Sequence, residues 1–110
     1  MRLKSVIWVQ AIIKRAEGGG AFATILHKGE ANAGAIVVVV DDGQVNSLYH
    51  QSRDWDTNEL VWRKQAQPMD AQALSEVLAR FRQRDPDLWV VEICDKSGRH
   101  FLSEPVIEEG

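Results

Sequence analysis

The chain has 110 residues, of which 45% are hydrophobic and 26% charged, and this balance argues against an intrinsically disordered chain and favours one folded domain. The formal net charge of −3 counts against a dedicated nucleic-acid binder, which usually carries a basic balance or a dense basic face. We therefore expect a single compact domain over residues 1–110, with nucleic acid an unlikely partner.

Residues 5–17 are predicted to form a first helix, with Ser5 as its N-cap and Gly18 as a left-handed stop. Apolar residues repeat at helical spacing and leave only a narrow polar face, so the helix is either deeply buried or shared with a second chain. The stretch VIWV, being β-branched and aromatic, could instead begin a strand, but the cap signals favour a helix.

A membrane partner is not expected. Gln10 interrupts the apolar residues near the N-terminus, and charged residues separate them from the AFA triplet that superficially resembles a signal-peptide cleavage site. No stretch reaches the roughly 18 apolar residues that a membrane-spanning helix needs. The single cysteine, Cys94, cannot form an internal disulfide and fits a reducing compartment. We therefore expect a cytoplasmic protein.

Four strands are predicted to follow in a run, separated by turns. They are AFATILHK (21–28), AGAIVVVV (33–40), VNSLYHQ (45–51) and LVWRKQ (60–65). The second is almost continuously apolar, which is typical of a central strand covered on both faces. The DDG triplet after it is a hairpin-turn signal, and the polar stretch SRDWDTNE predicts a loop.

A second helix is predicted from Asp70, its N-cap, to shortly before Pro86. Its apolar residues fall at i, i+3, i+4 and i+7, namely Leu74, Val77, Leu78 and Phe81. LWVVEIC predicts a last long strand, RHFL could add a short one, and about 103–110 should form a loose acidic tail. The expected fold is α+β, with one mainly antiparallel sheet of about five strands and two helices, in the order α-β-β-β-β-α-β.

The spacing of Gly29 and Gly34 matches the first half of a phosphate-binding loop. The second half is missing, because Ala35 and Ile36 stand where a lysine and a hydroxyl residue belong, and a strand follows in place of a helix. The hairpin interpretation is therefore preferred.

No catalytic, cofactor-binding or metal-ligating residue is predicted, and the question of an enzyme stays open with a non-catalytic protein favoured. The three histidines are scattered and do not show ligand spacing. Cys94 could be a nucleophile only if a base such as His100 approached it across the DKSG turn, and a free cysteine is more often a small core residue.

The sequence leaves two alternatives to an interaction role open. The element order loosely resembles the restriction-endonuclease-like core, in which Asp41 or Asp42 at the end of the central strand could help to hold a metal, but no [DE]-x-K tripeptide follows on the next strands. Nucleic acid could bind weakly to the basic end of the second helix, 80–84, together with Lys28.

The loop 52–59 places Trp55 next to Arg53 and among acids. Tryptophan and arginine dominate binding hot spots, so these two residues are candidate partner contacts. The alternative is a tryptophan folded back over the open end of the sheet, because large aromatic side chains are usually mostly buried.

The stretches IWVQAIIKR, GGAFATILHKGEANAGAIVVVV and RDPDLWVVEI resemble the family catalogued as domain of unknown function 1491, small proteins of alphaproteobacteria. The resemblance implies one compact bacterial cytoplasmic domain and brings no activity, cofactor or catalytic residue with it. It also draws attention to the turn with Lys28, Gly29 and Glu30, whose free amides could form a small anion nest. The sequence thus favours a small non-catalytic interaction module, binding an unknown protein partner or a second copy of itself.

Overall fold

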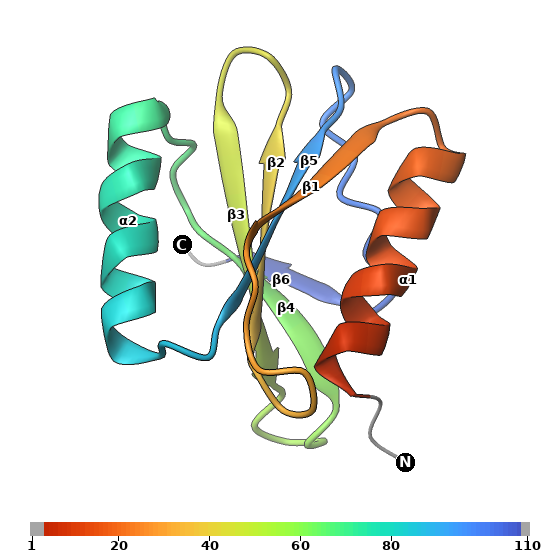
Figure 1. Cartoon of the computed structure of the whole chain (residues 1–110), viewed down its shortest axis with the longest axis vertical. Helices are drawn as coiled ribbons and strands as arrows, with labels where there is room; N and C mark the ends of the chain where they lie inside the picture. Colours follow the sequence, from red (N-terminus) through yellow and green to blue (C-terminus); the bar gives the residue numbers. More distant parts are fainter. Residues whose placement is uncertain (1–3, 109–110) are drawn as a thin grey trace.

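The computed structural model describes residues 4–108, and its centre is a six-stranded sheet with one helix on each face (Figure 1). The elements follow one another as α1 (Ser5–Gly18), β1 (Phe22–His27), β2 (Ile36–Asp41), β3 (Asn46–Arg53), β4 (Leu60–Lys64), α2 (Ala71–Arg84), β5 (Trp89–Cys94) and β6 (Val106–Glu108). The α+β class and the two helices are as predicted.

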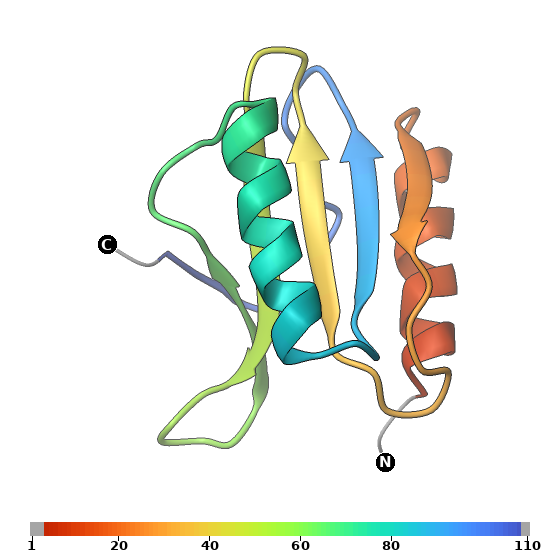
Figure 2. The same cartoon turned by 60° about the vertical axis from the view of Figure 1, so that its left-hand side comes forward.

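The sheet differs from the predicted one in two ways: it has six strands where about five were expected, and it is mixed. The strand order is β1-β5-β2-β3-β4-β6. β5 runs parallel to β2 and β6 runs parallel to β4, whereas the other three pairs are antiparallel. β1 and β2, which follow each other in the chain, are therefore not neighbours, because β5 lies between them (Figure 2).

The position of β2 follows from its composition. Ile36 and the four valines after it are all buried, so both faces of this strand need a cover and both edges need a neighbour. The side chains alternate along the strand. Val38 and Val40 join the core under α1, while Val37 and Val39 join the core under α2. The prediction of a central strand covered on both faces is thus confirmed.

The ends of α1 are built differently from the predicted ends. Lys4 occupies the N-cap and makes no side-chain cap, while the Ser5 hydroxyl donates a hydrogen bond to the carbonyl of Gly34. At the other end Gly18 is still helical and Gly20 has the left-handed conformation, with φ of 89°. Backbone hydrogen bonds from Gly19, Gly20 and Ala21, which lie beyond the helix, to carbonyls of its last turn complete the stop.

α2 matches its prediction closely. The carboxylate of Asp70 accepts a hydrogen bond from the backbone N–H of Ala73, as an N-cap should. The four predicted apolar residues pack on the α2 side of the sheet together with Met69, which precedes the helix. Its last turn carries Arg82 and Arg84, where positive charge suits the helix dipole.

The C-terminal segment corrects two predictions. RHFL forms no strand, and the expected loose tail from about 103 instead contains β6, which pairs with Trp62–Lys64 of β4. Val106 packs against the core under α1, and the indole N–H of Trp62 donates to Glu104 at 2.9 Å. These contacts order a segment whose acidic composition had predicted a loose tail. Within residues 4–108, no helix is long and apolar enough to cross a membrane.

Candidate functional site

β1 forms one edge of the sheet and leaves large apolar side chains in solvent. Phe22 is 76% exposed, Leu26 47% and Ile25 43%. Ile7 of the neighbouring α1 is exposed to a similar degree. Isolated apolar residues are ordinary on a protein surface, whereas several along one strand edge make that edge a candidate interaction surface. We call Phe22, Ile25 and Leu26 the β1 edge.

A β-bulge at Leu26 reverses the faces to which the side chains at the end of β1 point. Ile25 pairs with Val91, which faces α1, whereas His27 pairs with Val90, which faces α2. The extra residue therefore moves His27 to the other face of the sheet, where its Nδ1 lies 2.6 Å from the carbonyl oxygen of Leu88. This contact fixes the C-terminal end of the strand.

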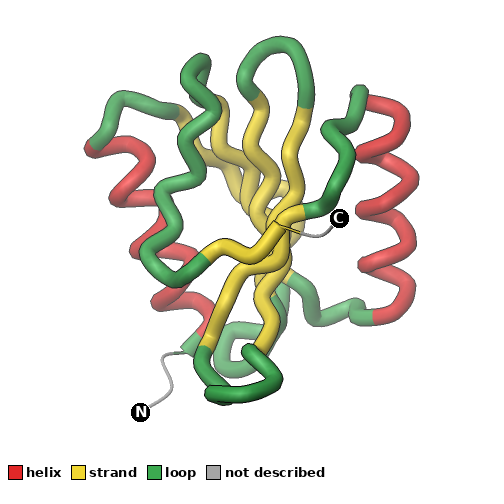
Figure 3. The backbone as a smooth tube through the Cα atoms, turned by 180° about the vertical axis from the view of Figure 1, so that it is seen from behind, coloured by secondary structure: helices red, strands yellow, loops and turns green. Residues whose placement is uncertain are grey.

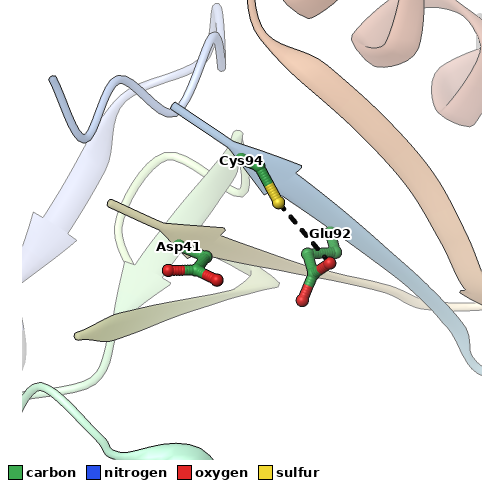
Figure 4. A group of neighbouring side chains, drawn as sticks. All are labelled: Asp41, Glu92 and Cys94. Atoms are coloured by element: carbon green, nitrogen blue, oxygen red, sulfur yellow. Dashed lines mark hydrogen bonds between the residues drawn. The ribbon is translucent and has the colours of Figure 1, made fainter. Parts of the chain in front are cut away.

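A second feature lies at the carboxyl ends of two parallel strands. Asp41 of β2 is in register with Cys94 of β5, and Glu92 precedes Cys94 by two residues, so all three side chains share the α2 face of the sheet (Figure 4). Their ligand atoms lie within 4.8 Å of one another, and the Cys94 Sγ–Glu92 Oε1 distance is 3.6 Å. We call these residues the acid–thiol cluster.

The electrostatics of the acid–thiol cluster disfavour nucleophilic chemistry. Partial burial, followed by the nearby carboxylates of Glu92 and Asp41, raises the pKa of the Cys94 thiol. The thiol is therefore protonated at neutral pH, and a protonated thiol is a poor nucleophile. The predicted base does not help, because His100 packs edge-on against Tyr49, a residue of the opposite, α1-side core.

The same cluster offers ligands to a cation. Two carboxylates and a thiol make a three-ligand set that would leave a position open for water or substrate. Within residues 4–108, neither Asp41 nor Glu92 forms an ion pair. Asp41 was singled out in the sequence, but Glu92 and Cys94 were missed as its partners, because the parallel pairing of β2 and β5 was not foreseen.

The predicted turn around Gly29 is held by its own side chains. The Glu30 carboxylate accepts hydrogen bonds from the backbone N–H groups of Asn32 and Ala33. A Cβ atom on Gly29 would lie 2.2 Å from the carbonyl oxygen of Asp87, so only glycine allows this approach. An anion at these amides would have to displace Glu30, and the binding role of Lys28, Gly29 and Glu30 stays a prediction.

The other two predicted residues lie on the β3–β4 connection. Trp55 is 92% exposed, so it is not folded back over the sheet. Arg53 donates to the carbonyl of Asn58 at 3.1 Å and lines a groove of about 790 Å³. The segment 32–35, which follows the predicted turn, also lines this groove, and the connections between strands gather at this end of the sheet (Figure 3). Their role in binding a partner stays a prediction.

Fold and surface together define a small α+β protein with a mixed sheet and an apolar edge strand, and within residues 4–108 the acid–thiol cluster is the group of His, Cys, Asp and Glu side chains that could hold a metal ion. The family model described as "Protein of unknown function (DUF1491)" matches residues 3–103. The chain therefore belongs to the DUF1491 family, as the sequence resemblance indicated.

Solved structures agree with this assignment. A crystal structure of a DUF1491 family protein from Caulobacter crescentus is 42% identical, with a TM-score of 0.89, over 96% of this chain and 100% of that one. An NMR structure of a family member from the same organism is 43% identical, with a TM-score of 0.86, over 97% and 98%. Protein Atu0922 from A. tumefaciens is 30% identical, with a TM-score of 0.81, over 100% and 98%. No curated protein matches the chain.

Proposed function

We propose that the chain is a non-catalytic interaction module that forms a homodimer through the β1 edge. The observation that carries the proposal is the exposure of Phe22, Ile25 and Leu26 on a strand whose outer backbone groups face no other strand of the described part of the chain, residues 4–108. Adding a strand to such an edge satisfies these backbone groups and covers the apolar side chains at once. We place the module in the cytoplasm, consistent with its one unpaired cysteine.

A second copy is the partner that suits this edge, because the strand is complementary to itself. In an antiparallel pair centred on Thr24, Phe22 would face Leu26 and Ala23 would face Ile25 of the other copy. Large apolar residues would then meet apolar residues, and no charges of the same sign would oppose each other. Such a contact uses the same surface on both copies and closes after two, which is the commonest symmetry of oligomers.

The test is the mass of the protein in solution, measured by sedimentation equilibrium over a range of concentrations. We expect the wild type to dimerise and Phe22→Lys to remain monomeric, because a lysine on a strand edge opposes pairing. Val45→Lys is the matched control, since Val45 is an exposed apolar residue outside β1. A wild type that stays monomeric at every concentration would rule the proposal out, as would equal dimerisation of Phe22→Lys.

A metal-dependent enzyme of nuclease type is the second candidate function, favoured by the acid–thiol cluster. Two carboxylates at the ends of adjacent strands are the ligands that magnesium and manganese prefer. Titration with Mn²⁺ should broaden the amide signals of Asp41, Glu92 and Cys94 in NMR spectra and spare those of an Asp41→Asn variant. Asp56→Asn, which removes an exposed loop acid, should leave the broadening intact. Spectra unchanged by Mn²⁺ would end this candidate.

A further inference from the structure

The groove beside Arg53 is built from three parts of the chain. The start of α1 contributes Lys4 and Trp8, the segment 32–35 forms one wall, and β3 with the connection to β4 forms the other. Its volume of about 790 Å³ lies within the range of small-molecule sites. All three parts meet at one end of the sheet (Figure 1).

The charge of the groove is opposite in sign to that of the whole chain. Among the described residues that line it, the only charged ones are the two cations Lys4 and Arg53, although the chain has a net charge of −3. Neither cation forms an ion pair within residues 4–108. The two positive charges are therefore free to attract an anion.

Glu59 lies between the groove-lining residues Asn58 and Leu60, and its exposed carboxylate makes no hydrogen bond within residues 4–108, whereas two other nearby acids are engaged by their own turns. Glu30 precedes one wall, and its carboxylate accepts two backbone N–H bonds from its own turn. Asp54 follows Arg53, and its carboxylate likewise accepts from the backbone N–H groups of Asp56 and Thr57. Both carboxylates are held by their own turns.

The walls are fixed before any ligand arrives. The backbone N–H groups of Ser5 and Val6 donate to the carbonyls of Asn32 and Ala31, and the Ser5 hydroxyl donates to Gly34. The indole of Trp89 donates to the carbonyl of Glu30 at 2.7 Å from behind. A site whose walls are held in this way pays less ordering entropy on binding.

The start of α1 does not itself supply the anion site. The N–H groups of its first two residues already donate to the loop carbonyls, so they are not available to a ligand. Attraction must come from the side chains of Lys4 and Arg53. Trp8 adds a flat apolar surface and an indole N–H that donates no hydrogen bond within residues 4–108.

We propose that this groove binds a small organic phosphate. The guanidinium of Arg53 offers a forked pair of donors that matches phosphate oxygens, and the ammonium of Lys4 supplies a second positive charge for a dianion. Trp8 would contact the organic part, and the amides of Gln51 and Asn58 supply further hydrogen-bond donors. This site lies apart from the β1 edge and is independent of the proposed dimer.

The test is an NMR titration of the full chain at low salt, following the backbone amides and the indole N–H of Trp8. The probes are AMP, inorganic phosphate and, as an uncharged control, adenosine. We expect AMP to shift the signals of the groove and adenosine to leave them in place. A response to inorganic phosphate as strong as that to AMP would overturn the proposal, because the organic part would then contribute nothing.

Substitutions of Arg53 and Lys4 test whether these two cations are required for AMP binding. Arg53→Gln and Lys4→Gln should each weaken AMP binding by about tenfold or more, since a hydrogen bond to a charged group contributes ~1.5–3 kcal/mol and each ~1.4 kcal/mol is a factor of ten. Lys96→Gln, an exposed lysine after β5, is the matched control and should bind as the wild type does. Groove signals that AMP does not move, or that Arg53→Gln and Lys4→Gln leave equally responsive, would refute the inference.

Discussion

The two edges of the sheet are built in opposite ways. β6 has only three residues, and its last residue, Glu108, forms an ion pair with Lys64 at 3.6 Å. β1 has six residues and carries no charge or proline between Phe22 and Leu26. A short, charged strand discourages further pairing, whereas a longer apolar strand invites it.

The difference shows where each edge obtains its stability. The β6 edge is stabilised by contacts inside the protein, because Trp62 of the adjacent β4 is fully buried and donates a hydrogen bond to Glu104. The β1 edge is stabilised by its pairing with β5 and its contact with α1. Its exposed side chains contribute little to the stability of the monomer. Natural sheets usually protect both edges. The unprotected edge is therefore the one expected to meet a partner.

Truncating one aromatic residue at each edge gives the largest contrast. Trp62→Ala should lower the free energy of unfolding by about 3–5 kcal/mol, as expected for a fully buried aromatic side chain. Phe22→Ala should change it by less than about 0.5 kcal/mol, as for a surface residue. Urea unfolding at a concentration low enough to keep the protein monomeric measures both. Similar losses for the two variants would contradict the division between the edges.

The partly buried hydrogen bond between Trp62 and Glu104 gives a smaller effect. Glu104→Ala leaves the indole N–H of Trp62 without its acceptor, which should cost about 1–3 kcal/mol. Glu59→Ala is the control, because this exposed side chain makes no hydrogen bond within residues 4–108, and its effect should stay below about 0.5 kcal/mol. The same urea experiment compares them, and equal effects would mean that Glu104 does not stabilise the β6 edge.

Low pH should weaken the contacts of Arg99 that stabilise the β1 edge. Arg99 bonds to the carboxylate of Asp95 and to the carbonyl of Gly19 at the end of α1, and the bonds from Arg99 lower the pKa of Asp95. A lowered pKa in the folded state stabilises the protein above the unfolded value of about 3.9 and loses that contribution as the pH falls through the folded value. Arg99→Met should therefore destabilise the protein at neutral pH, and this effect should become smaller as the pH falls below the unfolded value and through the lowered folded pKa of Asp95.

Hydrogen exchange is the measurement for this prediction, because it locates the change. At neutral pH the amides of β1 should exchange faster in Arg99→Met than in the wild type, with those of β6 unaffected. Arg82→Met, on the exposed part of α2, is the control. Faster exchange at both edges alike would show that Arg99 supports the whole sheet.

The reactivity of Cys94 gives the smallest effect and probes the β1 end of the sheet, since Cys94 is in register with Phe22. The negative charge of Glu92 contributes to the raised pKa of the thiol. Glu92→Gln should lower this pKa and increase the rate of alkylation by iodoacetamide at pH 8 by a few fold, because the thiolate is the reacting form. Glu76→Gln on α2 is the control. A rate that Glu92→Gln leaves unchanged would place the cause in burial and in the charge of Asp41.

Local sequence patterns were sufficient to predict those parts of the fold that depend on neighbouring residues in the chain. The spacing of apolar residues and the Asp70 cap fixed α2, and the unbroken apolar run fixed the central position of β2. Strand order has no such local cause. Nothing in AFATILHK or LWVVEIC states that β5 inserts between β1 and β2, and β6 became ordered through contacts with Trp62, far away in the chain.

The candidate sites were predictable to the same limited extent. Asp41, Arg53 and Trp55 stood out because unusual residues occur at a strand end or in a polar loop. The partners of Asp41 depended on the parallel pairing of β2 and β5, and the exposure of Phe22 depended on β1 being an edge. Lys4 became a candidate binding residue only through the fold, which places it in the same groove as Arg53.

The insertion of β5 between β1 and β2 also has a consequence during synthesis on the ribosome. β1 emerges early, but its one neighbour in the sheet is the strand that ends at Cys94. Until that strand leaves the exit tunnel, the apolar residues of β1 and one edge of β2 have no native partner, and such unpaired edges are prone to aggregation. The nascent chain is therefore most in need of a chaperone just before its last long strand appears.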